Sequence, residues 1–521
     1  MSLGAFLRRR GQALTIAAGA VIGMLLVAIV IPKAAGKPLH TRSQQVAATS
    51  AGAGPAQTAP GQAASTAGEQ QAGGAAAVGS GAAGGGTTSG STSSGSGGQA
   101  ASTATTSSPG GAVSGLQPTD RGVTATSVKI GFLILDVGSV AKFGVSVPGV
   151  DPQQQEDAYT AFVKDVNDHG GINGRTIQPV FRTFDVLSQD DMRAACLALT
   201  QDEKVFAVVG TGGFFGPPVL CITEENSTPL ILEGSQATPA EYYQRSGGRL
   251  FTMFPNATRQ MGDWASELDS LGVLKGKKIG ILSDQLSDPG DLMVGGALVP
   301  ALSRLGYSVT YRSVLSADLG TGASQVPVEV SQMHTKGVDM VFLATSTAYA
   351  TQFVETADGQ QWTPRWSVSD FGAMQGDTSS QNMPASYQGT VSITATRTGE
   401  WRANIPEPAA DAACRTIYEQ ATGKTMPRNN GTSTNGQYII TVENCGMTQI
   451  LAAAARAAGP NLTRASFVAA FPGLGAVNTP YFMGGAFGQD KPDYADVVRT
   501  TSWYADCKCW KPVDQPRRGR Y

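Results

Sequence analysis

The chain has 521 residues, with 38 Lys and Arg against 40 Asp and Glu, which gives a formal net charge of −2. This balance lacks the basic field that nucleic-acid binding requires. Only three histidines occur, at His40, His169 and His334, which disfavours histidine-based metal sites and Ser–His–Asp catalysis.

The N-terminus predicts a membrane anchor. Three consecutive arginines, Arg8–Arg10, precede an uncharged, largely apolar run at residues 13–31. At about 1.5 Å per residue, a helix over this run is roughly 28 Å long, close to the thickness of the bilayer hydrocarbon. The arginines favour a cytoplasmic position for residues 1–12. We therefore expect a single-pass anchor at residues 13–32 in the cell membrane, with the folded part extracytoplasmic. A cleaved signal peptide is the alternative.

A segment of low complexity follows the apolar run. From Ser43 to Thr119 the chain contains one charged residue, Glu69, and no aromatic residue. Such a segment cannot bury enough apolar area to offset the entropy lost on ordering. We expect residues 33–125 to form a disordered Gly/Ala/Ser/Thr-rich linker.

From residue 126 onward, short apolar runs alternate with amphipathic ones. The runs typical of strands lie at residues 128–135, 176–184, 205–210, 229–232, 249–254, 278–282, 308–314 and 338–343. The helical patterns lie at residues 158–166, 190–200, 217–225, 259–271 and 292–305. Repeated β–α units with buried strands predict an α/β fold with parallel sheets. A folded part of about 390 residues exceeds what one hydrophobic core usually spans, so two lobes are expected.

The order of several short motifs resembles that of one protein family. The chain reads Lys129-Ile130-Gly131 near the start of the folded part and, after a helix, Gly170-Gly171-Ile172-Asn173-Gly174-Arg175. These motifs are similar to the opening of the branched-chain amino-acid (Leu/Ile/Val) binding proteins, the substrate-binding proteins of an ABC importer class. Later segments are similar to the ligand loops of that family and to its crossover between lobes: Val208–Gly210, Thr228–Ile231, Ser235–Pro239 and Leu250–Pro255. The resemblance covers about residues 128–511, and the chain resembles proteins of this family of the actinobacterial style.

The resemblance implies the periplasmic-binding-protein type I fold, in which two α/β lobes are joined by a three-strand hinge and close on a ligand. We expect residues 126–521 to form this domain. Its first lobe would contain about residues 127–253 and 393–490, and its second about residues 254–392 and 491–521. Such clefts lie where the carboxyl ends of parallel strands converge.

The loop after the third predicted strand is the first candidate for ligand binding. Thr211, Gly212 and Gly213 follow a strand and precede a helix, so backbone N–H groups there are free to face an anion. The resemblance implies that this anion is a ligand carboxylate, while an ordinary strand-to-helix loop is the alternative. Phe214 and Phe215 are bulkier than the residues usual at this loop and would reshape the pocket.

The second candidate loop contains Ser235, Ala237 and Thr238. The resemblance implies that its backbone and hydroxyl groups hold the carboxylate and ammonium of an amino acid. The alternative, equally weighted, is that the hydroxyl residues cap the next helix, which starts at Pro239.

Two further candidates come from the predicted second lobe. Tyr349 stands in the predicted loop Ala344–Ala350, where the family commonly has an aromatic residue. Asp370 ends the strand after Trp366, where an acidic residue of the family pairs with the ligand's ammonium. A turn residue at the strand end is the alternative for Asp370. Near Asp288 the chain lacks the tyrosine-glycine pair typical of amino-acid binders, which leaves the ligand open.

Six cysteines in an exported domain suggest disulfides. Cys196 and Cys221 lie on consecutive predicted helices of one sheet, and so do Cys414 and Cys445. This neighbourhood favours those two pairs among the fifteen pairings that six cysteines allow, and Cys507-Lys508-Cys509 remains.

The sequence contains no P-loop, His-Glu-x-x-His, Gly-x-Ser-x-Gly or Cys-x-x-Cys motif. We therefore expect no enzyme activity, cofactor, metal site or nucleic-acid partner. The predicted function is an extracytoplasmic receptor that captures a small polar ligand, such as an amino acid or amide, for an ABC permease. The alternative is a membrane-tethered ligand sensor or cell-wall interaction module on the same fold.

Overall fold

The computed structural model describes residues 116–139, 150–428, 435–477 and 479–520. The predicted anchor at residues 13–32 and most of the predicted linker at residues 33–125 lie outside these ranges. Within them, every helix is too short or too polar to cross a bilayer.

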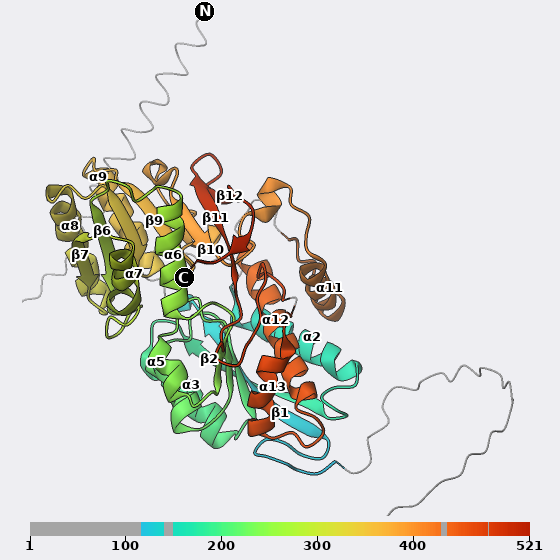
Figure 1. The fold of residues 1–521 in the computed structure, drawn as a ribbon. Helices are drawn as coiled ribbons and strands as arrows, with labels where there is room; N and C mark the ends of the chain where they lie inside the picture. The colour runs from blue at the N-terminus through green and yellow to red at the C-terminus, as the bar shows by residue number, and fades with distance from the viewer. Residues whose placement is uncertain (1–115, 140–149, 429–434, 478, 521) are drawn as a thin grey trace, which may run out of the picture. The chain divides into compact units, whose positions relative to one another are not determined.

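The first lobe is built on a five-stranded parallel sheet in the order β2-β1-β3-β4-β5 (Figure 1). The interior strand β1 is apolar and buried from Ile130 to Leu135, as expected of a parallel strand covered on both faces. The strands are β1 (Ser127–Asp136), β2 (Thr176–Asp185), β3 (Ala207–Gly210), β4 (Leu230–Leu232) and β5 (Leu250–Thr252).

Helices from two distant parts of the chain cover this sheet. Helix α2 contacts β1 and β2, and the later helices α11 and α12 pack on α2, as Figure 1 shows. The helices of this lobe are α2 (Pro152–Asp168), α3 (Gln189–Leu197), α4 (Pro217–Leu220), α5 (Ala240–Arg245), α11 (Ala409–Thr422), α12 (Asn435–Ala457) and α13 (Arg464–Ala470). Shorter helical turns are η2 (Ala198–Asp202), η3 (Cys221–Glu225), η7 (Glu400–Ala403) and η8 (Phe471–Leu474).

The second lobe is built on a mixed sheet in the order β12-β11-β10-β9-β8-β6-β7, with β13 paired to β11. The strands from β6 to β10 pair in parallel, whereas β11, β12 and β13 pair antiparallel. The strands are β6 (Ile279–Asp284), β7 (Val309–Leu315), β8 (Met340–Ala344), β9 (Arg365–Ser369), β10 (Val391–Thr394), β11 (Val497–Tyr504), β12 (Cys509–Pro512) and β13 (Arg517–Arg518). The helices are α6 (Ala257–Ser270), α7 (Val299–Arg304), α8 (Leu319–Thr335), α9 (Thr347–Gly359) and α10 (Asp377–Ser380), with the turns η4 (Val294–Leu298), η5 (Phe371–Ala373) and η6 (Ala385–Tyr387).

The chain passes between the two sheets three times, after β5, after β10 and before β11. The first and third crossings pair through Thr252 and Asp493. The Asp493 carboxylate accepts hydrogen bonds from the backbone N–H of Asn256 at 2.7 Å and from the Arg259 guanidinium. Arg259 is almost fully buried, so this ion pair fixes the crossings against each other.

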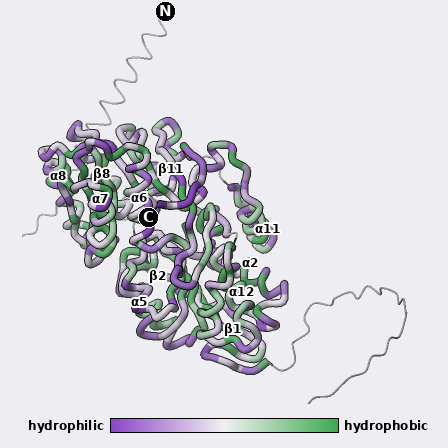
Figure 2. The backbone as a smooth tube through the Cα atoms, in the orientation of Figure 1, coloured by the Kyte–Doolittle hydropathy of each residue, from purple (hydrophilic) through white to green (hydrophobic). Residues whose placement is uncertain are grey.

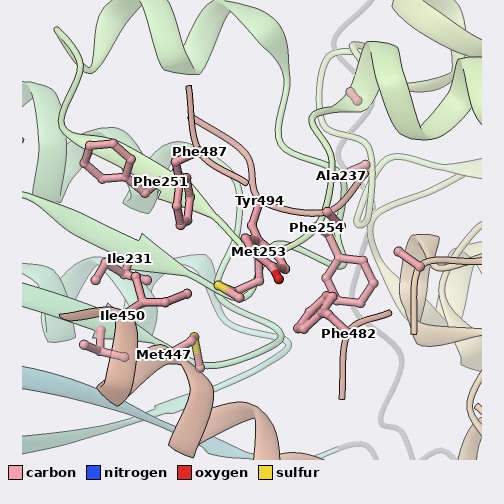
Figure 3. Packing of buried hydrophobic residues seen from close by; sticks show 14 of the residues in the cluster. Ile231, Ala237, Phe251, Met253, Phe254, Met447, Ile450, Phe482, Phe487 and Tyr494 are labelled. Atoms are coloured by element: carbon pink, nitrogen blue, oxygen red, sulfur yellow. The ribbon is translucent and has the colours of Figure 1, made fainter. Parts of the chain in front are cut away.

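Aromatic side chains fill the space around the crossings (Figure 3). Phe254 of the first crossing meets Phe482 edge-on at 4.9 Å between ring centroids. Met447 on α12 belongs to the same buried cluster. In Figure 2 hydrophobic and hydrophilic residues are interspersed along the described chain, as expected of elements with one buried face. The crossings are therefore stabilised by a hydrophobic core as well as by the buried ion pair.

The predicted strands and helices are largely present, and the Asn-Gly turn is confirmed, since Asn173 and Gly174 both have positive φ. The predicted helix at 292–305 is divided into η4 and α7. Pro300 lacks an N–H for the continuing helix, and a wider turn precedes it. Tyr349 lies in the first turn of α9 and not in a loop, because the helix already begins at Thr347.

The predicted end of the linker at residue 125 is too late. Val123 is buried, and the guanidinium of the buried Arg175 donates to the carbonyl oxygen of Gln117 at 3.0 Å and of Thr124 at 2.7 Å. A buried guanidinium needs such acceptors, so the segment from Gln117 onward belongs to the folded domain.

Both predicted disulfides are present. Cys196–Cys221 links α3 to η3, and Cys414–Cys445 links α11 to α12. Cys507 and Cys509 form a third disulfide at the turn between β11 and β12.

Candidate ligand-binding site

A cavity of about 250 Å³ lies between the carboxyl ends of the strands of the two sheets. The first lobe contributes residues that follow β1, β2, β3 and β4, together with α12. The second lobe contributes residues that follow β6 and β9 and the first turn of α9. Strand ends of parallel sheets are where α/β proteins bind ligands, so this cavity is the candidate binding site.

The side chains around the cavity are predominantly apolar. The apolar lining residues are Leu135, Val137, Val150, Val186, Leu187, Phe215, Leu286, Leu319, Ala348, Ala373, Ile439 and Ile440. The polar lining residues are Thr211, Glu233, Ser235, Gln236, Ser287, Ser346, Thr347, Gln375, Ser379, Glu443 and Tyr481. Among the described residues that line the cavity there is no Lys, Arg or His. A ligand would therefore meet apolar surface, hydroxyl and amide groups, and two carboxyl groups.

The first predicted loop lies at the cavity. Thr211, Gly212 and Gly213 all line it, and Phe215 adds an aromatic side chain to its wall. Gly213 has φ +85°, and a Cβ atom there would lie 2.9 Å from a methyl carbon of Leu135. Only glycine fits this position without a shift of the wall. The following helix α4 has only four residues, so it adds little dipole to the loop.

Glu233 follows β4 and lies next to this loop. Its carboxylate accepts hydrogen bonds from the backbone N–H and the hydroxyl of Ser235, both at 2.8 Å. Burial raises the pKa of Glu233 to about 7, although these hydrogen bonds oppose the rise. A Cβ atom at Gly212 would lie 3.2 Å from a carboxylate oxygen of Glu233, so the glycine loop lies beside the carboxyl group.

Glu443 on α12 is the second carboxyl group of the cavity. Burial raises its pKa well above the usual range, and the charges of Glu233 and Asp370 raise it further. No described residue makes a hydrogen bond or ion pair with it. The first lobe thus places two electrostatically coupled carboxyl groups at one wall of the cavity.

The second lobe offers neutral groups to the cavity, because its strand-end carboxylates are engaged elsewhere. Asp284 accepts hydrogen bonds from the backbone N–H groups of Ser287 and Ser346 and from the Thr345 hydroxyl, at 2.5–2.8 Å. Asp288 accepts from two backbone N–H groups at the start of the next helical segment. Neither carboxylate lines the cavity.

The remaining predicted site residues are not brought to the cavity, apart from Ser235, which lines it. Ala237 and Thr238 line a separate pocket of about 20 Å³. The Tyr349 hydroxyl donates to the carbonyl oxygens of residues 316 and 318, at 2.8 and 3.1 Å. Its helix α9 begins at Thr347, inside the predicted loop, and the ring packs in the core of the second lobe.

Asp370 ends β9 as predicted, but its carboxylate faces the neighbouring strand. It accepts hydrogen bonds from the Thr394 hydroxyl at 2.5 Å and from the backbone N–H of Ala395 at 2.7 Å. Burial raises the pKa of Asp370 to about 7, against these hydrogen bonds. This geometry agrees with the alternative interpretation of Asp370, a turn residue at the strand end.

Sequence reasoning missed Glu233 and Glu443. Glu233 directly follows the buried run Leu230–Leu232, and Glu443 interrupts the largely apolar stretch Tyr438–Val442 with a charge. A lone carboxylate at the end of a buried strand, or on the buried face of a helix, is the signal that could have found them.

His169 and His334 are both exposed, and no group of three or more potential metal ligands occurs among the described residues.

Two lobes joined by three crossings, with a cavity between their strand ends, define a two-lobed solute-binding protein. Residues 127–497 match the family model described as periplasmic binding protein, and the chain belongs to that family. Its fold is the type I form, and the family consists of binding proteins. A search of curated protein sequences finds no match.

Solved structures of ABC-transporter receptors share the fold. A fatty acid ABC transporter substrate-binding protein from Thermomonospora curvata aligns with a TM-score of 0.58 at 16% identity, covering 78% of this chain and 96% of that one. A possible leucine/isoleucine/valine-binding protein from Rhodopirellula baltica SH 1 aligns with a TM-score of 0.54 at 16% identity, covering 75% and 96%. A solute-binding protein from Rhodopseudomonas palustris HaA2, in complex with p-hydroxybenzoic acid, aligns with a TM-score of 0.57 at 13% identity, covering 76% and 98%.

Proposed function

We propose that this chain is the substrate-binding protein of an ABC importer and has no enzyme activity. It captures one small molecule in the cavity between its lobes, closes on it, and presents it to a membrane permease. The observation that supports this most directly is the cavity itself, which both lobes line with residues at the ends of their parallel strands. Closure of such lobes buries the ligand and marks the receptor as loaded.

We further propose that the receptor works outside the cytoplasm, held to the cell membrane by residues 13–32. Three disulfides among the described residues support an oxidising compartment. The proposed linker then begins at residue 33 and ends before Gln117. We propose that the lobes that close contain about residues 127–253 with 393–490, and about residues 254–392 with 491–521.

Uptake by living cells tests this function. A strain lacking the gene is complemented with the wild-type chain or with Ala348→Trp, whose indole fills the cavity from the first turn of α9. We expect the deletion strain to leave at least one small solute in the medium that the wild-type strain depletes, with no rescue by Ala348→Trp. The control Ser324→Trp, on the exposed face of α8, should restore uptake.

If purified full-length chain binds a solute whose uptake is equal in the wild-type and deletion strains, the chain is a sensor and the transport role is wrong.

A further inference from the structure

Glu233 and Glu443 are the unusual feature of the cavity. Their side chains line it, yet the two residues are only 5% and 8% exposed. No described Lys, Arg or His makes a salt bridge with either of them. A buried carboxyl group without a cation is costly, so the pair calls for an explanation that the packing of the domain does not supply.

Glu443 is the more isolated of the two. It lies one helical turn after Ile439 and one turn before Met447, so it shares their side of α12. Met447 and Ile450 pack in the core of the first lobe (Figure 3). Glu443 is the acidic residue in this stripe; it has no hydrogen-bond or ion-pair partner among the described residues, and it lines the cavity.

We propose that the cavity binds a protonated amine carried on an apolar body, with the ammonium group held by Glu233 and Glu443. This ligand class rests on the proposed receptor function, because the cavity is the same one. The ammonium supplies an opposite charge that no described side chain provides to either carboxyl group, and a charged hydrogen bond to each of them is stronger than a neutral one.

The rest of the cavity fits the apolar body. Leu135, Val186, Phe215 and Ile440 form wall surface that gains from contact with a hydrocarbon or aromatic group. A ligand made of one charged end and one apolar end would match the two parts of the lining.

The same geometry disfavours an anion. The glycine loop is the place where backbone N–H groups could meet a carboxylate, but Gly212 lies beside the Glu233 carboxyl group. A ligand carboxylate there would lie beside a like charge, with no described cation lining the cavity to offset it.

The groups around the pair set a pH dependence. Asp370 adds negative charge, and Tyr159 and Tyr481 are buried phenols whose pKa values are raised by burial and by Glu443. The pKa of Glu233 is raised to about 7, so below that pH the pair retains protons that an ammonium must displace. A simple alkylamine keeps its charge up to about pH 10, like the Lys side chain, so affinity should rise with pH through about 7.

Three probes of matched shape test the ligand class on the purified full-length chain: 2-phenylethylamine, 2-phenylethanol and 3-phenylpropionate. Calorimetric titration at about pH 8 should show binding of the amine, with the alcohol and the carboxylate at least about tenfold weaker. Lowering the pH to about 5.5 should weaken the amine by about tenfold or more. Equal or tighter binding of the alcohol or the carboxylate would overturn the proposal, and so would the absence of binding by all three.

Isosteric variants locate the contact. Glu443→Gln and Glu233→Gln should each weaken the amine by about tenfold or more, while Glu355→Gln, an exposed glutamate on α9, should stay within about threefold. Thermal unfolding of each variant shows whether it is folded. If one variant is not folded, the pH profile of the wild type still tests the proposal. If both variants fold and bind the amine as the wild type does, the proposed contact is wrong. If L-leucine binds and the amine does not, the ligand class is wrong while the uptake assay still decides the receptor function.

Discussion

Glu233 in the first lobe and Asp284 and Asp370 in the second all stand at the end of a buried parallel strand. Asp284 and Asp370 direct their oxygens to hydroxyl and N–H groups of their own lobe. Glu233 accepts hydrogen bonds from Ser235 and lines the cavity, as does Glu443, which has no hydrogen-bond or ion-pair partner among the described residues. Position at a strand end therefore does not decide whether a carboxyl group serves structure or ligand; the supply of neighbouring donors decides it.

The largest effect that this comparison predicts is on the stability of the second lobe. Asp370→Ala removes the acceptor for two buried donors, the Thr394 hydroxyl and the Ala395 N–H. We expect the free energy of unfolding to fall by about 2–4 kcal/mol, measured by chemical denaturation of the full-length chain. Asp370→Asn keeps one acceptor oxygen and should lose less than about half of that.

The same residue should have little effect on ligand binding. Asp370→Asn should change amine affinity by less than about threefold, because the carboxylate does not line the cavity. A loss of about a hundredfold in a folded variant would show that Asp370 turns to the ligand, as the family resemblance implied.

Much of the fold could be predicted because it is encoded locally. Buried strands such as β1 and β8 are continuous apolar runs, and the Gly170–Arg175 turn carries its conformation in its own residues. The helix pairs around Cys196 and Cys414 were also recognisable, and with them two disulfides. The glycine loop at Thr211 was found for the same reason, since a strand, a glycine pair and a helix follow each other in sequence.

The site was predicted less well because its chemistry depends on contacts between distant residues. Asp370 accepts a hydrogen bond from Thr394, which lies 24 positions later in the sequence on β10. Glu233 and Glu443 are 210 positions apart in the numbering and meet only when α12 packs on the first sheet. A local sequence pattern does not show which carboxylate will accept hydrogen bonds within its lobe and which will face a cavity.

The disulfides sharpen the contrast between the lobes. Cys196–Cys221 closes a sequence separation of 25 in the first lobe, whereas Cys507–Cys509 closes a separation of 2 in the second. Replacing both Cys196 and Cys221 by Ala should lower the free energy of unfolding by about 3 kcal/mol, because the longer loop restricts the unfolded chain more. The matched double variant at Cys507 and Cys509 should lose about half as much, about 1.5 kcal/mol. Equal losses in denaturant titrations would show that loop length does not govern these bonds.

The open carboxyl groups of the first lobe should cost stability when no ligand is bound. Glu443→Gln keeps the shape of the side chain and removes a buried acid that has no partner in the described part of the chain and whose pKa is raised mainly by burial. We expect the ligand-free variant at about pH 7.5 to be more stable than the wild type by about 1–3 kcal/mol. The exposed control Glu355→Gln should differ from the wild type by less than about 0.5 kcal/mol. A less stable Glu443→Gln variant would mean that the carboxylate has a structural partner after all.

The smallest predicted effect is a dependence of stability on pH. Burial raises the pKa of Glu233 to about 7 in the folded chain from its ordinary value of 4.5, so the folded state holds the proton more tightly than the unfolded state. The sign follows directly: the ligand-free protein is most stable below about pH 4.5 with respect to this group, and the advantage is lost as pH rises toward about 7. Asp370 acts in the same direction, with its pKa also raised to about 7 by burial.

Between about pH 5.5 and 7.5 we expect the free energy of unfolding to fall by about 1–2 kcal/mol through Glu233. Glu233→Gln should remove that part of the slope in parallel denaturant titrations, while Glu355→Gln should retain it. A wild-type slope of opposite sign, or one that Glu233→Gln leaves unchanged, would mean that Glu233 is already ionised and paired in the ligand-free cavity. In that case the contrast between the carboxylates of the two lobes would not hold.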